Sequence, residues 1–452
     1  MKKFFIIGIT IFALLSLSSK NINGAATDPV SIPDSNLRGS INLALGRAIN
    51  SSADITEADM ATISTLDARG KGISDLTGVE YLVRVNSLYL SDNNITDISA
   101  VGKLAPYSRL TTVYLDRNEL TDISALSNMI ALDRVTVYSN NIEDLSPLGT
   151  LQNLSYLSMA LNPVTDADQV YNIVDNISGV QILDLTGLPV AEETLISLKK
   201  QRGLMQLGLN STEISDQDLE IIGEYSALNY LHLNDNQIVD VSPLSSLNLF
   251  MLNLNNNQIT DISALSNMKI LYYLYLNNND ISDISPLSNL SNLYELYLAG
   301  NRITDISSIG DMNSQIKKLD ISNQEIILEE EIVYEPKIFD LSTNLYTNTG
   351  SNIDFTSNFI YAITEAGVYE LSSDWYYEGT VNSDRLGFIF SGSIKKSVEY
   401  IDNTIESPTD GSGNTITNDK LPETGKVEYS LFTLVITVTL ILLNQFNRVR
   451  NK

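Results

Sequence analysis

The sequence predicts an α/β solenoid in which short repeats stack side by side, each giving one strand to a parallel sheet and one helical turn to the opposite side. Two observations predict it: the pattern L-x-x-L-x-L-x-x-N-x-I-x-D-I-S recurs along the chain, and its commonest step is 22 residues. The second leucine position of the twelve copies is occupied by Leu66, Leu88, Val113, Val135, Leu157, Leu183, Leu207, Leu231, Leu252, Leu274, Leu296 and Leu319. Such a period and pattern indicate a leucine-rich-repeat solenoid.

Each position of the repeat has a physical role. In L-x-L the two leucines point to one side of a strand and face the core, while the residue between them faces outward. The asparagine can donate to and accept from backbone groups of the adjoining coil. A pair such as Ser242-Pro243 then places a capping hydroxyl before a proline suited to the first helical position. A repeat this short has room for only one or two helical turns, so we expect mostly 3₁₀ or short helices on the convex face.

Two copies in the middle of the array depart from this pattern. The three steps after the copy at Leu157 are 26, 24 and 24 residues long. Helix-prone segments at Glu192 to Lys200 and Asp216 to Tyr225 predict longer helices in the return segments. The asparagine position is occupied by Leu188 in one copy and Thr212 in the next. We therefore expect the curvature to change there.

The segment before the repeats is expected to be a helical cap. We assign residues 27–62 to this cap and residues 63–324 to the repeats. An open end of a solenoid exposes its core, so a terminal segment has to shield it. One side of the expected helix is apolar and is formed by Leu37, Ile41, Leu45 and Ile49.

After the array, residues 325–400 change to alternating, aromatic-rich runs that predict an all-β domain. The expected strands are Ile353 to Ile363, Gly367 to Tyr377 and Leu386 to Ile394, separated by Gly, Ser and Asn. The single tryptophan, Trp375, lies here. It could fill the core of the domain or bind a ligand, and filling the core is the favoured interpretation. The polar residues 401–420 then predict a disordered linker.

The N-terminal residues 1–26 have the three parts of an export signal. Lys2 and Lys3 give a basic start, Phe4 to Leu17 form a short apolar run, and the small residues Gly24-Ala25-Ala26 suit cleavage before Thr27. The alternative is a membrane anchor, but the apolar run is shorter than the ~20 residues that a spanning helix needs.

Composition limits the class of partner. The formal net charge is −27 at pH 7, so the surface repels nucleic acid and anionic lipid, and we expect neither as a partner. The chain has no cysteine, which excludes disulfides and thiol ligands.

The C-terminal residues 421–452 resemble a sorting signal of the sortase system. They read Leu421-Pro422-Glu423-Thr424-Gly425, then an apolar stretch from Val427 to Phe446, then a basic tail. The apolar stretch is long enough to insert transiently in a bilayer, and the basic tail holds its end in the cytoplasm. The resemblance implies that sortase cuts after Thr424 and joins it to peptidoglycan, so the protein would be secreted and held covalently in the wall of a Gram-positive bacterium. The alternative is a single-pass anchor with a chance pentapeptide.

Between Pro33 and Val398 the chain also resembles the internalin family of bacterial surface proteins. The resemblance rests on Ile55 to Met60 (ITEADM), Leu66 to Ala68 (LDA), the repeated Asp-Ile-Ser-Pro/Ala-Leu, Leu319 to Gln324 (LDISNQ) and Phe388 to Ser393 (FIFSGS). It implies a helical cap, the repeats and an immunoglobulin-like sandwich fused as one unit. Internalins that promote uptake bind host receptor ectodomains on the concave face. The linker would keep this chain's concave face close to the wall, with no further domain between them.

Outward positions of the strands supply the candidate binding residues. The residue between the paired leucines and the residue before the pair both face outward. One aromatic group lies toward the N-terminal half and comprises Tyr89, Tyr114, Arg134, Tyr138 and Tyr156. The other comprises Tyr230, His232, Tyr273, Tyr275, Glu295 and Tyr297. We expect Tyr275 and Tyr297 to form a ladder with a ~5 Å step. Large aromatic side chains at exposed positions favour protein binding, although tyrosines can also stack only to stabilise a sheet.

Three functions remain open at this stage. The leading hypothesis is a surface protein that binds a host protein, in adhesion or invasion. The alternative is a structural protein on the bacterial side, which binds wall glycan or neighbouring surface proteins. A surface hydrolase is third, because His232 has no second histidine and most carboxylates repeat in the Asp-Ile-Ser turn. We therefore expect no enzyme activity, no cofactor and no metal, with calcium on the acidic surface left open.

Overall fold

The computed structural model describes residues 27–306, 308, 316–333, 337–340, 353–355, 360–363, 367–381 and 386–400. The expected export signal, linker and sorting signal lie outside these residues. Among the described residues, no helix combines the length and the apolar character needed to cross a membrane.

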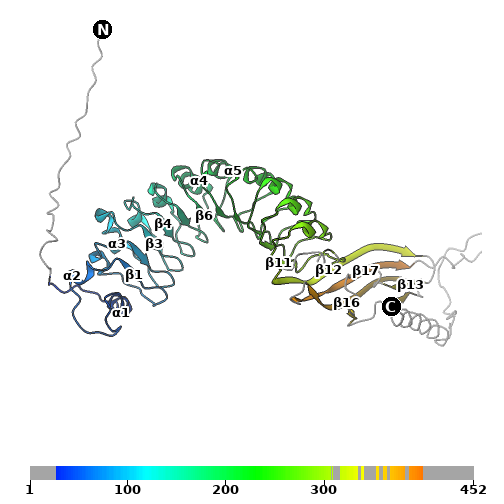
Figure 1. The fold of residues 1–452 in the computed structure, drawn as a ribbon, viewed down its shortest axis with the longest axis horizontal. Helices are drawn as coiled ribbons and strands as arrows, with labels where there is room; N and C mark the ends of the chain where they lie inside the picture. Colours follow the sequence, from blue (N-terminus) through cyan, green and yellow to red (C-terminus); the bar gives the residue numbers. More distant parts are fainter. Residues whose placement is uncertain are drawn as a thin grey trace, which may run out of the picture.

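Twelve parallel strands line the inner side of a curved stack, and the convex helices lie on its outer side (Figure 1). The strands are β1 (Thr65–Asp67), β2 (Ser87–Tyr89), β3 (Thr112–Tyr114), β4 (Arg134–Thr136), β5 (Tyr156–Ser158), β6 (Ile182–Asp184), β7 (Gln206–Gly208), β8 (Tyr230–His232), β9 (Met251–Asn253), β10 (Tyr273–Tyr275), β11 (Glu295–Tyr297) and β12 (Lys318–Val333). Successive strands pair with the second leucine positions opposite each other, as in Leu66↔Leu88 and Leu274↔Leu296. The predicted leucine-rich-repeat solenoid and its register are confirmed.

The return segments form short helices on the convex side. The 3₁₀ turns are η1 (Val79–Tyr81), η2 (Ala105–Tyr107), η3 (Ser124–Leu126), η4 (Ser146–Thr150), η5 (Ser242–Ser246), η6 (Ser263–Asn267) and η7 (Ser285–Asn289). The α-helices of the array are α3 (Ser99–Gly102), α4 (Ala167–Asn176), α5 (Glu192–Leu198) and α6 (Asp216–Ile222). The two longer helices expected from the sequence are α5 and α6. The change of curvature stays a prediction, although α4 and α5 lie at the crest of the arc in Figure 1.

The expected role of the serine at the start of each turn is wrong. Ser242 is the first residue of η5, and its hydroxyl donates to Asp240 Oδ2 at 2.9 Å instead of capping the turn. Asp240 Oδ1 accepts the backbone N–H of Ser242 at 2.7 Å. The same bond links Asp283 to Ser285 at 2.8 Å. In these turns the aspartate two residues before the serine N–H therefore fixes the backbone, which is a scaffold role.

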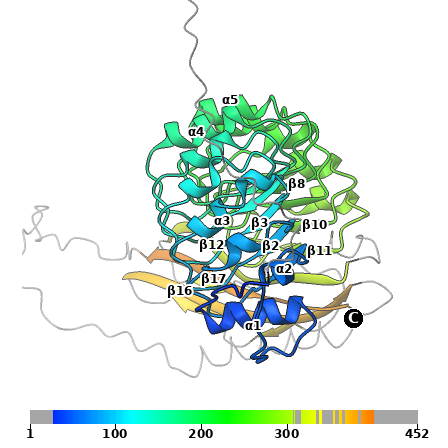
Figure 2. The same ribbon diagram turned by 90° about the vertical axis from the view of Figure 1, so that its left-hand side faces the viewer.

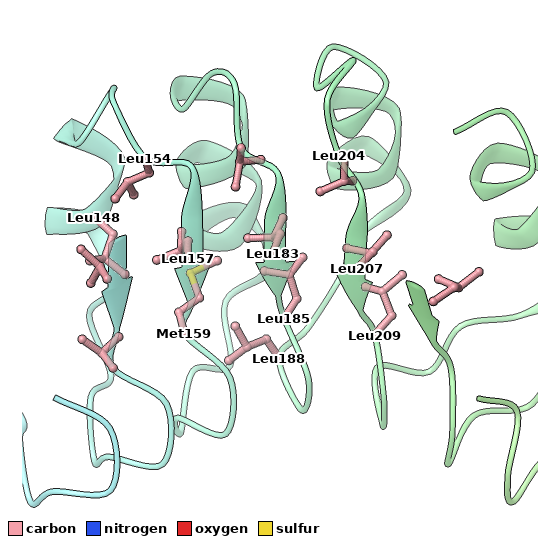
Figure 3. Close-up of a cluster of buried hydrophobic side chains, with 14 of the residues drawn as sticks. Leu148, Leu154, Leu157, Met159, Leu183, Leu185, Leu188, Leu204, Leu207 and Leu209 are labelled. Atoms are coloured by element: carbon pink, nitrogen blue, oxygen red, sulfur yellow. The ribbon is translucent and has the colours of Figure 1, made fainter. Parts of the chain in front are cut away.

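The core is one continuous stack of leucines. Leu157, Leu183 and Leu207 are each 0% exposed and lie at the same level of successive strands (Figure 3). Full burial of such a side chain contributes about 1.5–3 kcal/mol, so each added repeat stabilises its neighbours.

A ladder of buried asparagines runs beside this core. Asn279 Nδ2 donates to the carbonyls of Leu254, Leu276 and Asn277 at 3.0, 3.1 and 3.3 Å, and its Oδ1 accepts the N–H of Ile259 at 3.0 Å. Equivalent bonds are made by Asn93, Asn118, Asn140, Asn162, Asn236, Asn257, Asn301 and Gln324. This confirms the predicted role of the asparagine position.

The ladder is interrupted where the sequence lacks asparagine. Leu188 is buried there, and the N–H of Val164 bonds to the carbonyl of Asn162 at 2.8 Å instead of to a side chain of the next repeat. Thr212 retains one bond, from its hydroxyl to the carbonyl of Leu209 at 2.7 Å.

Before the array, α1 (Ser35–Ala44) packs against β1, and α2 (Glu57–Met60) follows it (Figure 2, with α1 in the foreground). Leu37 and Ile41 are 0% exposed, and Leu45 packs on the core just after the helix ends. Ile49 is 56% exposed, so its assignment to the apolar side is wrong. The helix ends before Ile49 is reached, so the helical periodicity does not extend that far.

After the array, β12 continues beyond the repeats and pairs in parallel with β17 (Leu386–Tyr400). β17 pairs antiparallel with β16 (Gly367–Val381), and β16 pairs with β14 (Ile353–Phe355). A separate pair joins β13 (Lys337–Asp340) and β15 (Ile360–Ile363). The expected strand Ile353 to Ile363 is thus represented by two described strands, and Trp375 lies in β16. The described residues of this segment lie in strands, while the all-β domain and its immunoglobulin-like arrangement stay predictions.

Candidate binding face

The register of the strands brings the predicted binding residues onto one face. Two outward rows cross the concave side of the sheet, because strand pairing places equivalent residues of successive repeats opposite each other. The first row contains Tyr89, Tyr114, Thr136, Ser158, Asp184, Gly208, His232, Asn253, Tyr275 and Tyr297. The second contains Arg134, Tyr156, Tyr230, Tyr273 and Glu295. The first row therefore has tyrosines toward both ends and small or polar residues in the middle, whereas the tyrosines of the second row lie between Arg134 and Glu295.

The N-terminal tyrosine group is held by ring contacts and one arginine. The ring centroids of Tyr89 and Tyr114 lie 5.2 Å apart in an edge arrangement, and those of Tyr114 and Tyr156 lie 6.2 Å apart. Arg134 Nε donates to the Tyr114 hydroxyl at 3.3 Å, and its Cζ lies 4.8 Å from the centroid of the Tyr156 ring. The hydrogen bond with Tyr114 raises the pKa of Arg134 above its ordinary value. The group is therefore ordered by its own contacts.

Two further arginines belong to this group and were not among the predicted residues. Arg69 lies 5.2 Å from the centroid of Tyr89, and Arg117 lies 5.2 Å from that of Tyr138. Both side chains are about half exposed and are paired with carboxylates, Arg69 with Asp67 at 2.6 Å and Arg117 with Asp92. Arg69 lies two residues beyond the outward position Asp67, and Arg117 lies three residues beyond Tyr114, where the chain has left the strand. Strand alternation alone does not place such residues.

The C-terminal group contains the expected ladder. Tyr275 and Tyr297 stack with centroids 5.1 Å apart and an interplanar angle of 20°, which confirms the predicted spacing. The Tyr275 hydroxyl donates to Glu295 Oε2 at 3.3 Å, and Glu295 pairs with Lys318 at 2.8 Å. Burial, followed by the nearby charge of Glu295, raises the pKa of Tyr275 to about 12. Tyr275 is therefore a neutral hydrogen-bond donor at neutral pH.

An aromatic stack beside this ladder was missed in the sequence. Phe250 and Tyr272 are parallel at 5.0 Å, and Tyr272 and Tyr294 are parallel at 4.8 Å. Tyr230 contacts one end of this stack, with its ring 5.7 Å from Phe250, and Tyr273 lies 4.9 Å from Tyr272. The missed residues recur every 22 residues, which was the available signal. They were overlooked because each directly precedes a strand residue already assigned outward.

Between the two aromatic groups the first row consists of small or polar residues. Asp184 accepts a hydrogen bond from the Ser158 hydroxyl at 3.1 Å and another from the backbone N–H of Thr186 at 3.1 Å. At Gly208 a Cβ atom would lie 3.1 Å from Asp184 Cγ, and closer still to its Oδ1, so a larger residue would displace the Asp184 carboxylate. Burial lowers the pKa of His232, with the charge of Asp184 acting in the opposite direction. His232 is thus neutral at neutral pH.

The arrangement suits recognition better than catalysis. Within the described residues, His, Asp and Glu side chains form no group of three that could hold a metal ion. Asp184 accepts from the Ser158 hydroxyl and the Thr186 N–H, and within the described residues it forms no ion pair with His232. Aromatic rings and arginines, the side chains enriched at protein interfaces, dominate the face instead.

Comparisons with known proteins agree with this architecture. The leucine-rich-repeat family, described as Leucine Rich repeats (2 copies), matches residues 64–129, 247–289 and 271–311. Internalin H of Listeria monocytogenes is 34% identical over 95 residues, which are 20% of this chain and 17% of that protein. The match thus spans about a sixth of Internalin H.

Solved structures extend the likeness. The crystal structure of an internalin (inlF) from Listeria monocytogenes is 29% identical and covers 72% of this chain and 92% of its own, with a TM-score of 0.54. An internalin C2 from the same species is 27% identical and covers 60% and 97%, with a TM-score of 0.33. Sequence, repeat register and fold therefore lead to one conclusion: this chain is a leucine-rich-repeat protein homologous to the internalins of Listeria.

Proposed function

We propose that the chain is a wall-anchored surface protein that binds a host surface protein through the concave face of its repeats. The observation that carries the proposal is the pair of aromatic groups on this face. Within each group, half-buried rings contact their neighbours. Large rings held at the surface by their neighbours lose little freedom on binding, and truncation of such Tyr or Arg anchors typically costs about 2 kcal/mol or more of affinity.

The rest of the chain suits presentation of this face. We assign residues 1–26 to export, 27–62 to a cap, 63–324 to the repeats, 325–400 to an immunoglobulin-like domain, 401–420 to a linker and 421–452 to covalent anchoring by sortase at Thr424. The burial of Leu37 and Ile41 against β1 supports the cap. The single core stack of the repeats supports a rigid binding surface. Adhesion or invasion is the role such a surface would serve.

The test is binding of the secreted form, residues 27–407, to host cells and separately to purified bacterial walls. A variant carrying Tyr273→Ser, Tyr275→Ser and Tyr297→Ser removes part of the C-terminal aromatic group. A matched control carries Tyr81→Ser and Tyr107→Ser, which are 37% and 41% exposed in convex 3₁₀ turns. We expect host cells to bind the native form and the control, and to lose at least tenfold in affinity for the concave variant.

Binding to walls alone would favour the second candidate, a structural protein that binds wall glycan or neighbouring surface proteins. The linker supports this candidate, since 20 extended residues span at most about 70 Å and hold the repeats near the wall. Equal binding by the concave variant and the control would refute the concave face as the binding surface.

A further inference from the structure

Arg134 differs from the other arginines of the concave face in what it contacts. Arg69 and Arg117 each pair with a carboxylate of the chain itself. Arg134 forms no ion pair with any described residue, and it contacts the Tyr114 hydroxyl and the face of the Tyr156 ring. Asp133 acts on Arg134 through its charge but does not pair with it.

The two tyrosines hold the guanidinium group in a fixed position. Nε is used by Tyr114 at 3.3 Å, and the Tyr156 ring lies 4.8 Å below Cζ. Neither contact engages the two terminal nitrogens. Because the group is planar, these nitrogens present two parallel N–H bonds at its outer edge, the geometry that a carboxylate accepts in bidentate form.

The strand positions beside Arg134 carry small side chains. In the strand register, Arg134 lies opposite Thr112 of β3, which in turn lies opposite Ser87 of β2. Thr112 is buried and Ser87 is half-buried, so small hydroxyl side chains occupy the positions next to the arginine. The Tyr89 and Tyr114 rings border this floor from the neighbouring row. Arg134 is therefore surrounded by hydroxyl side chains on one side and by tyrosine rings on the other.

We propose that this site, formed by Arg134 over Thr112 and between Tyr114 and Tyr156, binds a single Asp or Glu carboxylate of the protein ligand. This inference rests on the proposed function, because it specifies the chemistry of one contact on the same face. The ligand is a protein segment that presents an acidic side chain beside an apolar one, the acid pairing with Arg134 and the apolar group packing on the tyrosines.

A carboxylate fits better than a phosphate or a sulfated chain. The site holds one unpaired arginine, whereas polyanion sites need several cations. Asp116 and Asp184 act through their charge on Tyr156, and the whole chain carries a net charge of −27. A carboxylate carries a single negative charge. Placed directly against Arg134, it is attracted by the guanidinium group and is repelled less by these acids than a phosphate or a sulfated chain would be.

The experiment uses random 12-residue peptides displayed on phage, selected against the purified full chain. We expect the enriched peptides to contain an Asp or Glu next to an aromatic or aliphatic residue. Arg134→Gln is then expected to weaken the selected peptide about thirtyfold, and Arg134→Lys, which keeps the charge but loses the planar fork, about tenfold. Arg202→Gln, at an exposed arginine in a convex loop, is the matched control and should change nothing.

A double-mutant cycle identifies the partner of Arg134. Replacing the acidic residue of the peptide with its amide should weaken binding to the native chain but have little effect on Arg134→Gln. Circular dichroism confirms that each variant is folded, and Arg134→Lys provides the readout if Arg134→Gln is not. Enrichment without acidic residues, or independent effects of the two changes, overturns the proposal. If Tyr273→Ser with Tyr275→Ser and Tyr297→Ser still abolishes host-cell binding, the proposed function stands and only the carboxylate site fails.

Discussion

The asparagine ladder permits a quantitative prediction for Asn279→Ala. The change removes the acceptor of the buried Ile259 N–H, a bond of 3.0 Å. A buried donor left without a partner costs about 1–3 kcal/mol. The substitution also deletes the three donations from Nδ2 to backbone carbonyls.

These carbonyls keep other partners, which limits the loss. The Leu254 carbonyl still accepts from Asn257 at 3.0 Å, and the Leu276 carbonyl still accepts from Asn301 at 2.9 Å. The loss of each donated hydrogen bond should therefore lower the free energy of unfolding by about 0.5 kcal/mol, the low end of the net contribution of a hydrogen bond. With the unpaired N–H, the free energy of unfolding should fall by about 2.5–4.5 kcal/mol.

The assay is urea denaturation of the chain followed by circular dichroism. The exposed Asn289, in η7, supplies the control, because Asn289→Ala should change the free energy of unfolding by less than about 0.5 kcal/mol. A loss below about 1 kcal/mol for Asn279→Ala, or equal losses for both variants, would refute the reasoning that the ladder satisfies buried backbone groups.

Three further predictions concern the concave face. Gly208→Ala should destabilise the chain by about 1–3 kcal/mol, because the added methyl group meets Asp184. Adding Asp184→Ala should restore most of the lost stability in the same denaturation assay. If stability is not restored, the contact between the two positions is contradicted. The single histidine gives one NMR titration curve, and Asp184→Asn should lower the pKa of His232 further, since the Asp184 charge raises it; an unchanged curve would show that the two do not interact. Because the pKa of His232 is lowered on folding, its contribution to stability is lost as pH falls below the unfolded value of about 6.5. Glu295→Gln should bring the pKa of Tyr275 down from about 12. The pKa is measured from the difference in phenolate absorbance between each chain and its Tyr275→Phe counterpart. A pKa that stays near 12 would show that the charge of Glu295 does not contribute to the shift.

The repeats could be predicted well from the sequence because their physics is local and periodic. Once Leu274 and Leu296 are aligned at a 22-residue step, strand alternation fixes that Tyr275 and Tyr297 face outward and stack. The buried asparagine follows from the same alignment, since the turn beside it leaves backbone groups that need a polar partner.

Other features depend on where the chain leaves the strand. Arg117 and Tyr272 lie just outside three-residue strands, so alternation does not determine their direction, and only the folded turn shows that one lies over Tyr138 and the other stacks on Phe250. The 10-residue helix α4 was likewise not expected, although the 26-residue step before Leu183 leaves room for it. The serine at the turn was assigned the capping role that Asp240 performs, because both side chains can accept a backbone N–H and spacing alone does not choose between them.

The continuation of β12 beyond the repeats has a mechanical consequence. Within the array, neighbouring strands pair over only three residues, whereas the pairing of β12 with β17 extends from Ile321↔Phe390 to Val333↔Tyr400. A pull along the stack loads these ladders in series, and the shortest ladder yields first. If the proposed anchor beyond Tyr400 holds the chain, tension applied at the concave face would therefore open the pairing between two repeats before it broke the junction with the β domain. The repeats, which form a rigid surface without load, would then be the part of the protein that extends under shear.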